Sequence, residues 1–542
     1  MNHDVALGLL GLPVDILLYM LVYLDAYDLV RARKLCNTLR QLIDSSEELL
    51  YTIDLKYYHT IPSPLPVSVL PIAIRRKLLR QRESAWQKAE YSQRDRIPFP
   101  HPDRYHQWSC GVLGIIPRGE IKFIQFPLSA GDRAGTTMCR QWSYKIDNLT
   151  VHYSYSPMQD LLVLLTRLLP VENHEYEISF RSLSEDKFHP DAASAVVKME
   201  LLGPKYTEVM IFGDYYGLFC KNVGSNGARV DVLQVWNWKV KDWYRVKIFD
   251  PEDGTMHFRL ILNDRLLVVN TIGDLTLYSL VNSSDAIQLI VTFSLPSLPS
   301  TSAFRCIMFA RNQDHDYSSF NTPLCSSCFH GSARNQLIAI TMIIEVERRL
   351  LHSCILYVEQ DRLLELESTY TNLYGKGSRD PRALPWSAWG PGYARIFSNS
   401  QSLSGLSCCY GLRTAGLIGE NFGRGELRLQ QLCIRDFNPH RVRHYKTGDG
   451  TEWHERLVEG DPPNADLQSL FLESIGGLPY LEVTTQERFL ADGIYMDESR
   501  VMLSLASPNS FTGWFHPLDY NLFAAVERDL RQQEMQQHLP EI

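Results

Sequence analysis

Two cysteines and a histidine at metal-ligand spacing are the clearest chemistry-bearing residues of the sequence. Cys325-Ser-Ser-Cys328 is followed two residues later by His330, and His315 precedes the pair by ten residues. Thiolates and imidazoles suit zinc, and a Cys-x-x-Cys knuckle supplies two ligands. A second cysteine pair is missing at the usual distance and the segment is polar, so two loop thiols without metal are the favoured interpretation.

Other candidate motifs lack a necessary part. His440 and His444 have i, i+4 spacing, but no Glu follows the first, and Pro439 favours a loop with surface histidines. The run Tyr-Gly-Lys-Gly-Ser-Arg from Tyr374 lacks the first Gly and the Lys-Ser order of a phosphate-binding loop. A triad assembled from distant positions stays open, because one sequence does not reveal such geometry. We expect a protein that is not an enzyme, with no catalytic residue, metal or cofactor.

Composition limits the class of protein and its partners. The chain has 542 residues, 45% of them apolar, which excludes a mostly disordered chain and predicts more than one domain. Its formal net charge of −8 is spread without a long single-sign block, so we expect no nucleic-acid or membrane partner. Eleven cysteines, an odd number, favour a reducing compartment, cytoplasmic or nuclear.

The N-terminal domain, residues 1–55, is predicted to hold three short helices. The first carries apolar residues at helical spacing after Pro13, and a second begins at Asp28 as a plausible N-cap. A unit of this size is too small to bury its apolar surface alone, so it needs a hydrophobic partner.

Residues 56–109 are predicted to form a connector. Four prolines in 61–71 indicate an extended segment, and a basic helical segment follows between Arg75 and Arg96. We interpret the basic helix as a solvated face beside the domain join, with a phosphate-binding or acid-binding patch as the alternative.

Residues 110–520 are predicted to form an all-β domain of the propeller type. Two consecutive stretches starting at Val209 and Phe258 each supply four candidate strands, 49 residues apart, which is close to the ~40–50 residues of a propeller blade. Strand spacing without a helical pattern between favours a propeller of six or seven blades over a sandwich. The last segment, 521–542, has one apolar helical face, which indicates an amphipathic helix packed outside the body or, alternatively, a dimerising helix.

The N-terminal residues resemble an F-box in order and spacing. The resemblance rests on Leu12-Pro13-x-Asp15, Leu24-Asp25, Asp28-Leu29 and Leu35-Cys36, although Leu39 stands where an aromatic residue is often found. The rest of the chain is similar to fungal F-box proteins whose C-terminal region is a degenerate β-propeller. The matching segments are Gln159-Asp160-Leu161-Leu162-Val163, Trp236-Asn237-Trp238-Lys239, Leu384-Pro385-Trp386, Trp389-Gly390-Pro391 and Met496-Asp497-Glu498-Ser499-Arg500.

The resemblance implies a substrate receptor of an SCF-type cullin-RING ubiquitin ligase, in which the F-box docks on the Skp adaptor and through it on cullin. The propeller then binds an unknown target protein. The predicted adaptor-binding residues are Leu12, Pro13, Asp15, Ile16, Leu17, Leu21, Leu24, Leu29 and Cys36. The alternatives are an interaction scaffold outside any ligase, or a propeller hydrolase or lectin.

Aromatic residues of the propeller have two interpretations. Trp386, Trp389 and the Trp236–Tyr244 cluster are suited to a recognition surface, because Trp and Tyr are favoured interface anchors. The favoured interpretation is that these rings seal one blade against the next.

Overall fold

A computed structural model gives the fold of the chain. The residues that it describes are 9–62, 71–90, 92–98, 106–116, 119–126, 140–169, 175–201, 206–223, 229–249, 256–262, 264–281, 287–310, 329–347, 350–374, 383–398, 408–418, 429–445, 455–460, 465–491, 493–498, 500–504 and 511–519. The predicted C-terminal helix at 521–542 and the candidate ligands His315, Cys325 and Cys328 lie outside these residues.

The N-terminal domain is helical. It contains a 3-10 turn η1 (Leu9–Gly11) and four α-helices, α1 (Val14–Val22), α2 (Ala26–Leu35), α3 (Asn37–Ser45) and α4 (Glu47–Tyr57). The three expected helices correspond to α1–α3, and α4 follows them. Side chains of Asp25, Cys36 and Ser46 accept the N–H groups at the starts of α2, α3 and α4. The cap of α2 is therefore Asp25, and the predicted cap Asp28 lies in its first turn.

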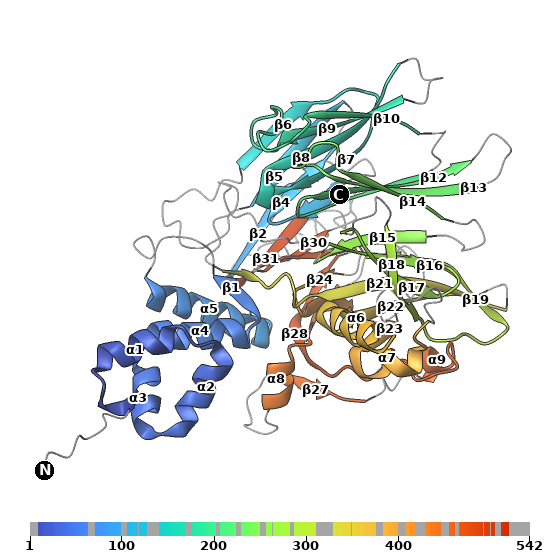
Figure 1. Cartoon of the computed structure of the whole chain (residues 1–542). Coiled ribbons are helices and arrows are strands. Elements are labelled where there is room, and N and C mark those ends of the chain that lie inside the picture. Colours follow the sequence, from blue (N-terminus) through green and yellow to red (C-terminus); the bar gives the residue numbers. More distant parts are fainter. Residues whose placement is uncertain are drawn as a thin grey trace, which may run out of the picture.

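Helix α5 (Ile72–Lys88) joins this domain to the β domain (Figure 1). The prediction of a solvated basic face is wrong, because Arg75, Arg82, Glu83 and Trp86 are buried. A short strand, β1 (Thr60–Pro62), adds a backbone link by pairing with β20 (Phe329–Gly331).

Three four-stranded antiparallel blades come first in the β domain, each built from consecutive strands. They are β3 (His106–Ser109), β4 (Val112–Ile115), β5 (Glu120–Gln125) and β6 (Arg140–Lys145); β7 (Thr150–Ser156), β8 (Leu161–Arg167), β9 (Glu175–Ser182) and β10 (Val196–Glu200); and β11 (Tyr206–Phe212), β12 (Tyr215–Val223), β13 (Arg229–Asn237) and β14 (Tyr244–Phe249). A second 3-10 turn, η2 (Pro157–Gln159), lies between β7 and β8.

Four more blades follow. They are β15 (Met256–Ile261), β16 (Arg265–Asn270), β17 (Asp274–Ser279) and β18 (Gln288–Ser294); β19 (Ser302–Phe309), β21 (Leu337–Val346), β22 (Leu350–Glu359) and β23 (Ala394–Ser398); β24 (Cys408–Tyr410), β25 (Arg413–Ile418), β26 (Leu429–Asp436), β28 (Tyr480–Leu490) and β27 (Arg456–Val458); and β29 (Gly493–Met496), β30 (Val501–Ser504), β31 (Phe511–Asp519) and β2 (Ser92–Pro98). In the described residues this makes six four-stranded sheets and one five-stranded sheet. The eight strands predicted from Val209 to Phe293 are the blades β11–β14 and β15–β18.

Apolar side chains between consecutive blades hold the ring together. Phe123 packs edge-on against Tyr155 in the next blade, with ring centroids 5.2 Å apart. The last and first blades share a cluster that contains Met502 of β30 and Trp108 of β3, so the ring closes. Strand β2, which precedes the first blade in sequence, completes the last blade by pairing with β31. The prediction of a propeller with six or seven blades is confirmed, with six regular blades and the five-stranded sheet as the seventh.

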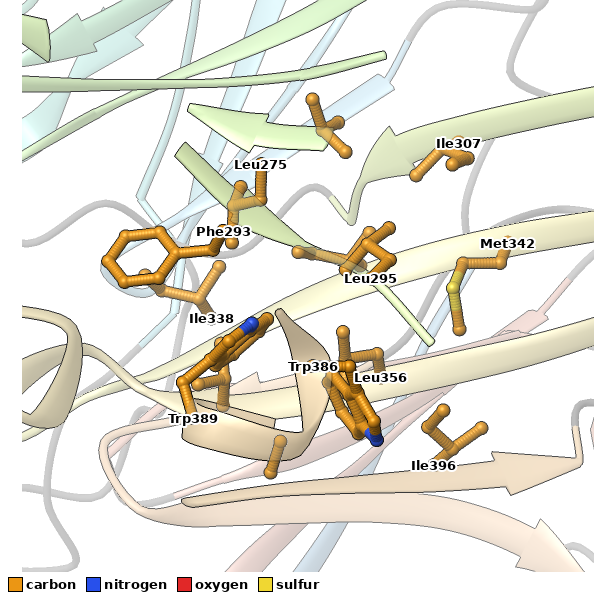
Figure 2. Close-up of a cluster of buried hydrophobic side chains, with 14 of the residues drawn as sticks. Leu275, Phe293, Leu295, Ile307, Ile338, Met342, Leu356, Trp386, Trp389 and Ile396 are labelled. Carbon is orange, nitrogen blue, oxygen red and sulfur yellow. The ribbon is translucent and has the colours of Figure 1, made fainter. Parts of the chain in front are cut away.

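Helices inserted between the strands were not predicted from the sequence. They are α6 (Gln360–Tyr374), α7 (Trp386–Tyr393), α8 (Pro439–His444) and α9 (Ala465–Gln468). Trp386 and Trp389 of α7 are 1% exposed and lie in the cluster between the blades β15–β18 and β19–β23 (Figure 2). The interpretation that these rings seal blade against blade is therefore confirmed for this pair.

Candidate functional site

Helix α1 has an inward face that builds the core of the helical domain. Leu17 and Leu21 are buried, and Leu21 packs with Leu29 of α2. Leu24 and Cys36 are half-buried against the same cluster. Of the predicted adaptor-binding residues, these five therefore lie within or against the domain's own core in the isolated chain.

The opposite side of α1 is apolar and open to solvent. Pro13, Asp15 and Ile16 are exposed and Leu12 is half-buried. Other large apolar residues, which were not among the predicted ones, share this exposure. We call the exposed apolar residues of η1 and α1, with Ile16 among them, and Tyr23 directly after α1, the α1 surface: Leu9, Leu10, Val14, Ile16, Tyr19, Met20, Val22 and Tyr23, each 45–72% exposed.

The spacing of this surface was readable in the sequence. Ile16, Tyr19, Met20 and Tyr23 follow the i, i+3, i+4, i+7 pattern of one helix face. The core-facing residues Leu17, Leu21 and Leu24 follow the same pattern one residue later. A helix that is apolar on both sides needs a neighbour on each, and the described part of the chain supplies only one.

Two residues of the α1 surface contact each other. The hydroxyl of Tyr23 donates to that of Tyr19 at 2.6 Å, and the two rings meet edge-on with centroids 5.2 Å apart.

Helix α5 fixes the helical domain to the propeller through buried ion pairs. Glu83 is completely buried and contacts Arg82 (2.8 Å) and, across the join, Arg413 of β25. Arg413 also donates to Asp436 of β26 at 2.9 Å, as does Arg441 at 2.6 Å. Burial opposes ionisation of Asp436, but the two arginines outweigh it and lower its pKa to about 2.

The other side of α5 binds the helical domain. Arg76 and Arg80 each donate to Asp54 of α4 at 2.8 Å. Near the end of the helix, Trp86 packs between the last two blades, and its indole N–H donates to the carbonyl oxygen of Glu498 at 3.2 Å. Helix α5 thus contacts both domains along its length, which explains its burial.

A histidine pair lies beside a small open pocket of about 30 Å³ at the same join. The ring of His59 stacks on that of His440 of α8, with centroids 5.1 Å apart and an angle of 19°. The backbone of His59 has φ of 52°, and its carbonyl accepts the N–H of Ser332. Burial is the main cause that lowers the pKa of His59 to about 4.

The histidines considered as metal ligands contact other groups in the structure. His330, on β20, is buried with Nδ1 3.2 Å from Glu498. His440 and His444 lie on a short helix rather than the predicted loop, and His440 stacks on His59. Within the described residues, no group of three or more His, Cys, Asp or Glu is placed to hold a metal ion. Nor is any helix there long and apolar enough to cross a membrane.

Comparison with known proteins identifies the helical domain. The model of the F-box domain family matches residues 9–51, which span η1, α1–α3 and the start of α4. The N-terminal helices form an F-box. No curated protein matches the chain.

Among solved structures, apo AztD from Citrobacter koseri is similar, with 10% identity over 47% of this chain and 82% of that chain. Its TM-score of 0.19 is too low to support a structural argument. The identification therefore concerns the F-box, and its α1 surface is the candidate functional site.

Proposed function

We propose that this chain is the substrate-recognition subunit of an SCF-type ubiquitin ligase. Its F-box binds the Skp adaptor, which connects it to cullin, and its propeller binds a target protein. The chain itself performs no chemistry in this role. It brings the target close to the ubiquitin-carrying enzyme, which raises the effective concentration of one near the other.

The α1 surface is the observation that carries this proposal. Eight exposed apolar residues lie on one turn, one helix and the residue that ends it in an F-box domain. Leaving such a set in water is unfavourable by about 25 cal/mol for each Å² that a partner would cover. An adaptor with an apolar groove is the partner of matching chemistry.

The joint between the domains supports the same role. Glu83, Arg413 and Asp436 form a buried network between α5 and the propeller, and Trp86 reaches the last two blades. A fixed joint holds a bound target at a constant distance from the adaptor. The α1 surface belongs to the helical domain, which lies to one side of the propeller in Figure 1, so a partner on it leaves the β domain accessible.

Three properties complete the proposal. We infer a cytoplasmic or nuclear protein from the number of its cysteines, because a reducing compartment keeps thiols unpaired. The fungal origin and the absence of enzymatic activity rest on the resemblance and on the missing motifs described above.

Co-purification of the full chain with the Skp adaptor and cullin tests the proposal. We expect the wild-type chain to retain both proteins in one complex on size-exclusion chromatography. Retention of the adaptor without cullin would favour the scaffold outside a ligase. A folded chain that retains neither would overturn the proposal.

A further inference from the structure

The outermost strand of one blade has an open edge with apolar side chains beside it. Strand β14 is the last strand of the blade β11–β14, and among the described residues it pairs only with β13. Tyr244, Val246 and Ile248 alternate along β14 and are 56%, 36% and 65% exposed. Residues two apart on a strand point to the same face of the sheet, so these side chains form one apolar row.

The opposite face of β14 is basic. Arg245 and Lys247, which alternate with the apolar row, are half-buried on this face. The guanidinium carbon of Arg245 lies 4.6 Å from the ring centroid of Trp243, and Nζ of Lys247 lies 5.5 Å from that of Tyr278. Contact with aromatic rings keeps both cations close to the strand.

The whole segment around β14 carries an excess of positive charge. Residues 239–249 contain four basic residues and one acidic residue. Lys239 pairs with Asp214 at 2.7 Å, whereas Lys241 is exposed. This charge attracts an acidic segment. It disfavours pairing with β14 of a second copy, because the cations of two identical strands would then meet, and like charges on paired strands repel.

Other outermost strands of the propeller differ from β14. The four exposed residues of β6 are all polar or charged. The outer edge of β18 is covered by Leu384, whose N–H donates to the carbonyl oxygen of Thr292 and whose carbonyl oxygen accepts the N–H of Ser294. Strand β14 thus combines an open edge, an apolar row and a basic face.

We propose that β14 binds an extended segment of a partner protein by strand addition, and that apolar and acidic residues alternate along this segment. Its backbone pairs with the open edge, as in other complexes in which a peptide adds a strand to a sheet. Its apolar side chains lie on the face of Tyr244, Val246 and Ile248, and its acidic side chains on that of Arg245 and Lys247.

The partner is the target protein, an assignment that rests on the proposed function. The blade β11–β14 lies away from helix α1 in Figure 1. A target on β14 and an adaptor on the α1 surface can therefore bind the chain at the same time.

Binding of a fluorescent peptide of alternating valine and glutamate to the full chain tests the proposal by anisotropy. We expect saturable binding, about tenfold tighter than that of the matched peptide with lysine in place of glutamate. Methylation of every backbone N–H of the valine–glutamate peptide should weaken its binding about tenfold, because strand pairing needs these donors. No binding of the valine–glutamate peptide, or equal affinity for the three peptides, would overturn the proposal.

Substitutions on β14 test its two faces separately. Ile248→Glu should weaken binding of the valine–glutamate peptide about tenfold, because it places a charge in the apolar row. Lys247→Glu should weaken that peptide and strengthen the valine–lysine peptide, each about tenfold. Lys198→Glu, the same change at an exposed residue of β10, is the matched control and should alter neither. Unchanged affinities in the folded Lys247→Glu variant would contradict recognition by charge.

The peptide and the adaptor bind different domains, so the failures of the two proposals are distinguishable. A chain that captures the adaptor but not the peptide would overturn the role of β14 and leave the proposed function in place. A chain that binds the peptide but not the adaptor would support β14 as a binding edge and overturn the ligase role. A dimer on size-exclusion chromatography that Ile248→Glu converts to a monomer would place a second copy on β14 and overturn its assignment to an acidic partner.

Discussion

Residues on the two sides of helix α1 differ in what they contact. Leu21 packs in the F-box core with Leu29, whereas Ile16 is 47% exposed on the α1 surface. Both are branched aliphatic residues of similar size. Their environment therefore decides which of them contributes to stability of the isolated chain.

Alanine substitution separates these two roles. Leu21→Ala should lower the free energy of unfolding by about 2–5 kcal/mol, because it removes buried contacts and leaves a cavity. Ile16→Ala should change it by less than about 0.5 kcal/mol. Urea unfolding monitored by circular dichroism measures both, and equal losses would contradict the assignment of the two faces.

A pH dependence is expected from His59. Its pKa is about 4 in the folded chain, against about 6.5 for an unfolded histidine. Above pH 6.5 it is neutral in both states and has no effect. As the pH falls from 6.5 towards 4, the unfolded state takes up the proton first, so stability should fall by about 2–3 kcal/mol.

His59→Asn tests this pH dependence. Asn has no titratable group and tolerates the positive φ of this position. Urea unfolding of the variant should depend less on pH between 6.5 and 4 than that of the wild type. His352→Asn, on strand β22, is the matched control and should retain the wild-type dependence; the same slope in all three proteins would exclude His59 as the cause.

Sequence alone could identify the apolar residues of the F-box but not which side of α1 each occupies. Among the predicted adaptor-binding residues, Leu17, Leu21 and Leu29 are buried in the isolated chain, whereas Ile16 is exposed. The apolar residues of the two faces of α1 have the same helical spacing. The positions of the neighbouring helices therefore decide which face is buried. The contact of His257 with Glu208 was also invisible, because the two lie 49 positions apart on different blades.

At the scale of elements, helix α5 is the part that determines how the domains are joined. Its charges suggested a solvated helix, because a single sequence does not show that Glu83 faces Arg413, which is 330 positions later. Strands were easier to predict, because the alternation of apolar and polar residues and the turn residues between strands are local features of the sequence. The inserted helix α7 was missed because it is short and contains Pro391.

Glu83→Gln should strongly destabilise the joint. The substitution removes a buried negative charge, so Arg82 and Arg413 lose their buried ionic partner. Removing one partner of a buried ion pair typically lowers the free energy of unfolding by about 3–5 kcal/mol. Glu185→Gln is the matched control, because its pair with Lys187 is exposed and worth less than about 1 kcal/mol. Thermal unfolding compares the variants, and similar midpoints would contradict a stabilising role for the buried network.

At the scale of the whole molecule, the propeller is closed by chain segments that are far apart in sequence. Strand β31 lies between β30 and β2, and Gly513 is opposite both Leu503 and Arg96. This arrangement ties the last blade to the segment that follows α5, so the ring and the F-box joint are connected.

Gly513→Pro tests the closure of the ring. Proline removes a backbone N–H from a central strand, which should cost about 3 kcal/mol or more and lower the unfolding midpoint of the β domain. Gly513→Ala keeps that N–H and should have a smaller effect. Equal midpoints for the two variants would show that β31 does not close the ring by backbone pairing.

The proposed function depends on the α1 surface being the place where the adaptor binds. Ile16→Glu puts a charge at the centre of this surface. Ile248→Glu makes the same change at an exposed residue of β14 in the propeller. A comparison of these variants separates a specific interface from a general loss of apolar surface.

Calorimetric titration of the Skp adaptor into the full chain is the most direct test. For the wild type and Ile248→Glu we predict equal affinity with a negative heat-capacity change, the mark of apolar burial. Ile16→Glu should bind at least tenfold more weakly, because a central interface residue is lost. Equal affinity of all three folded proteins, or no binding by the wild type, would contradict the account.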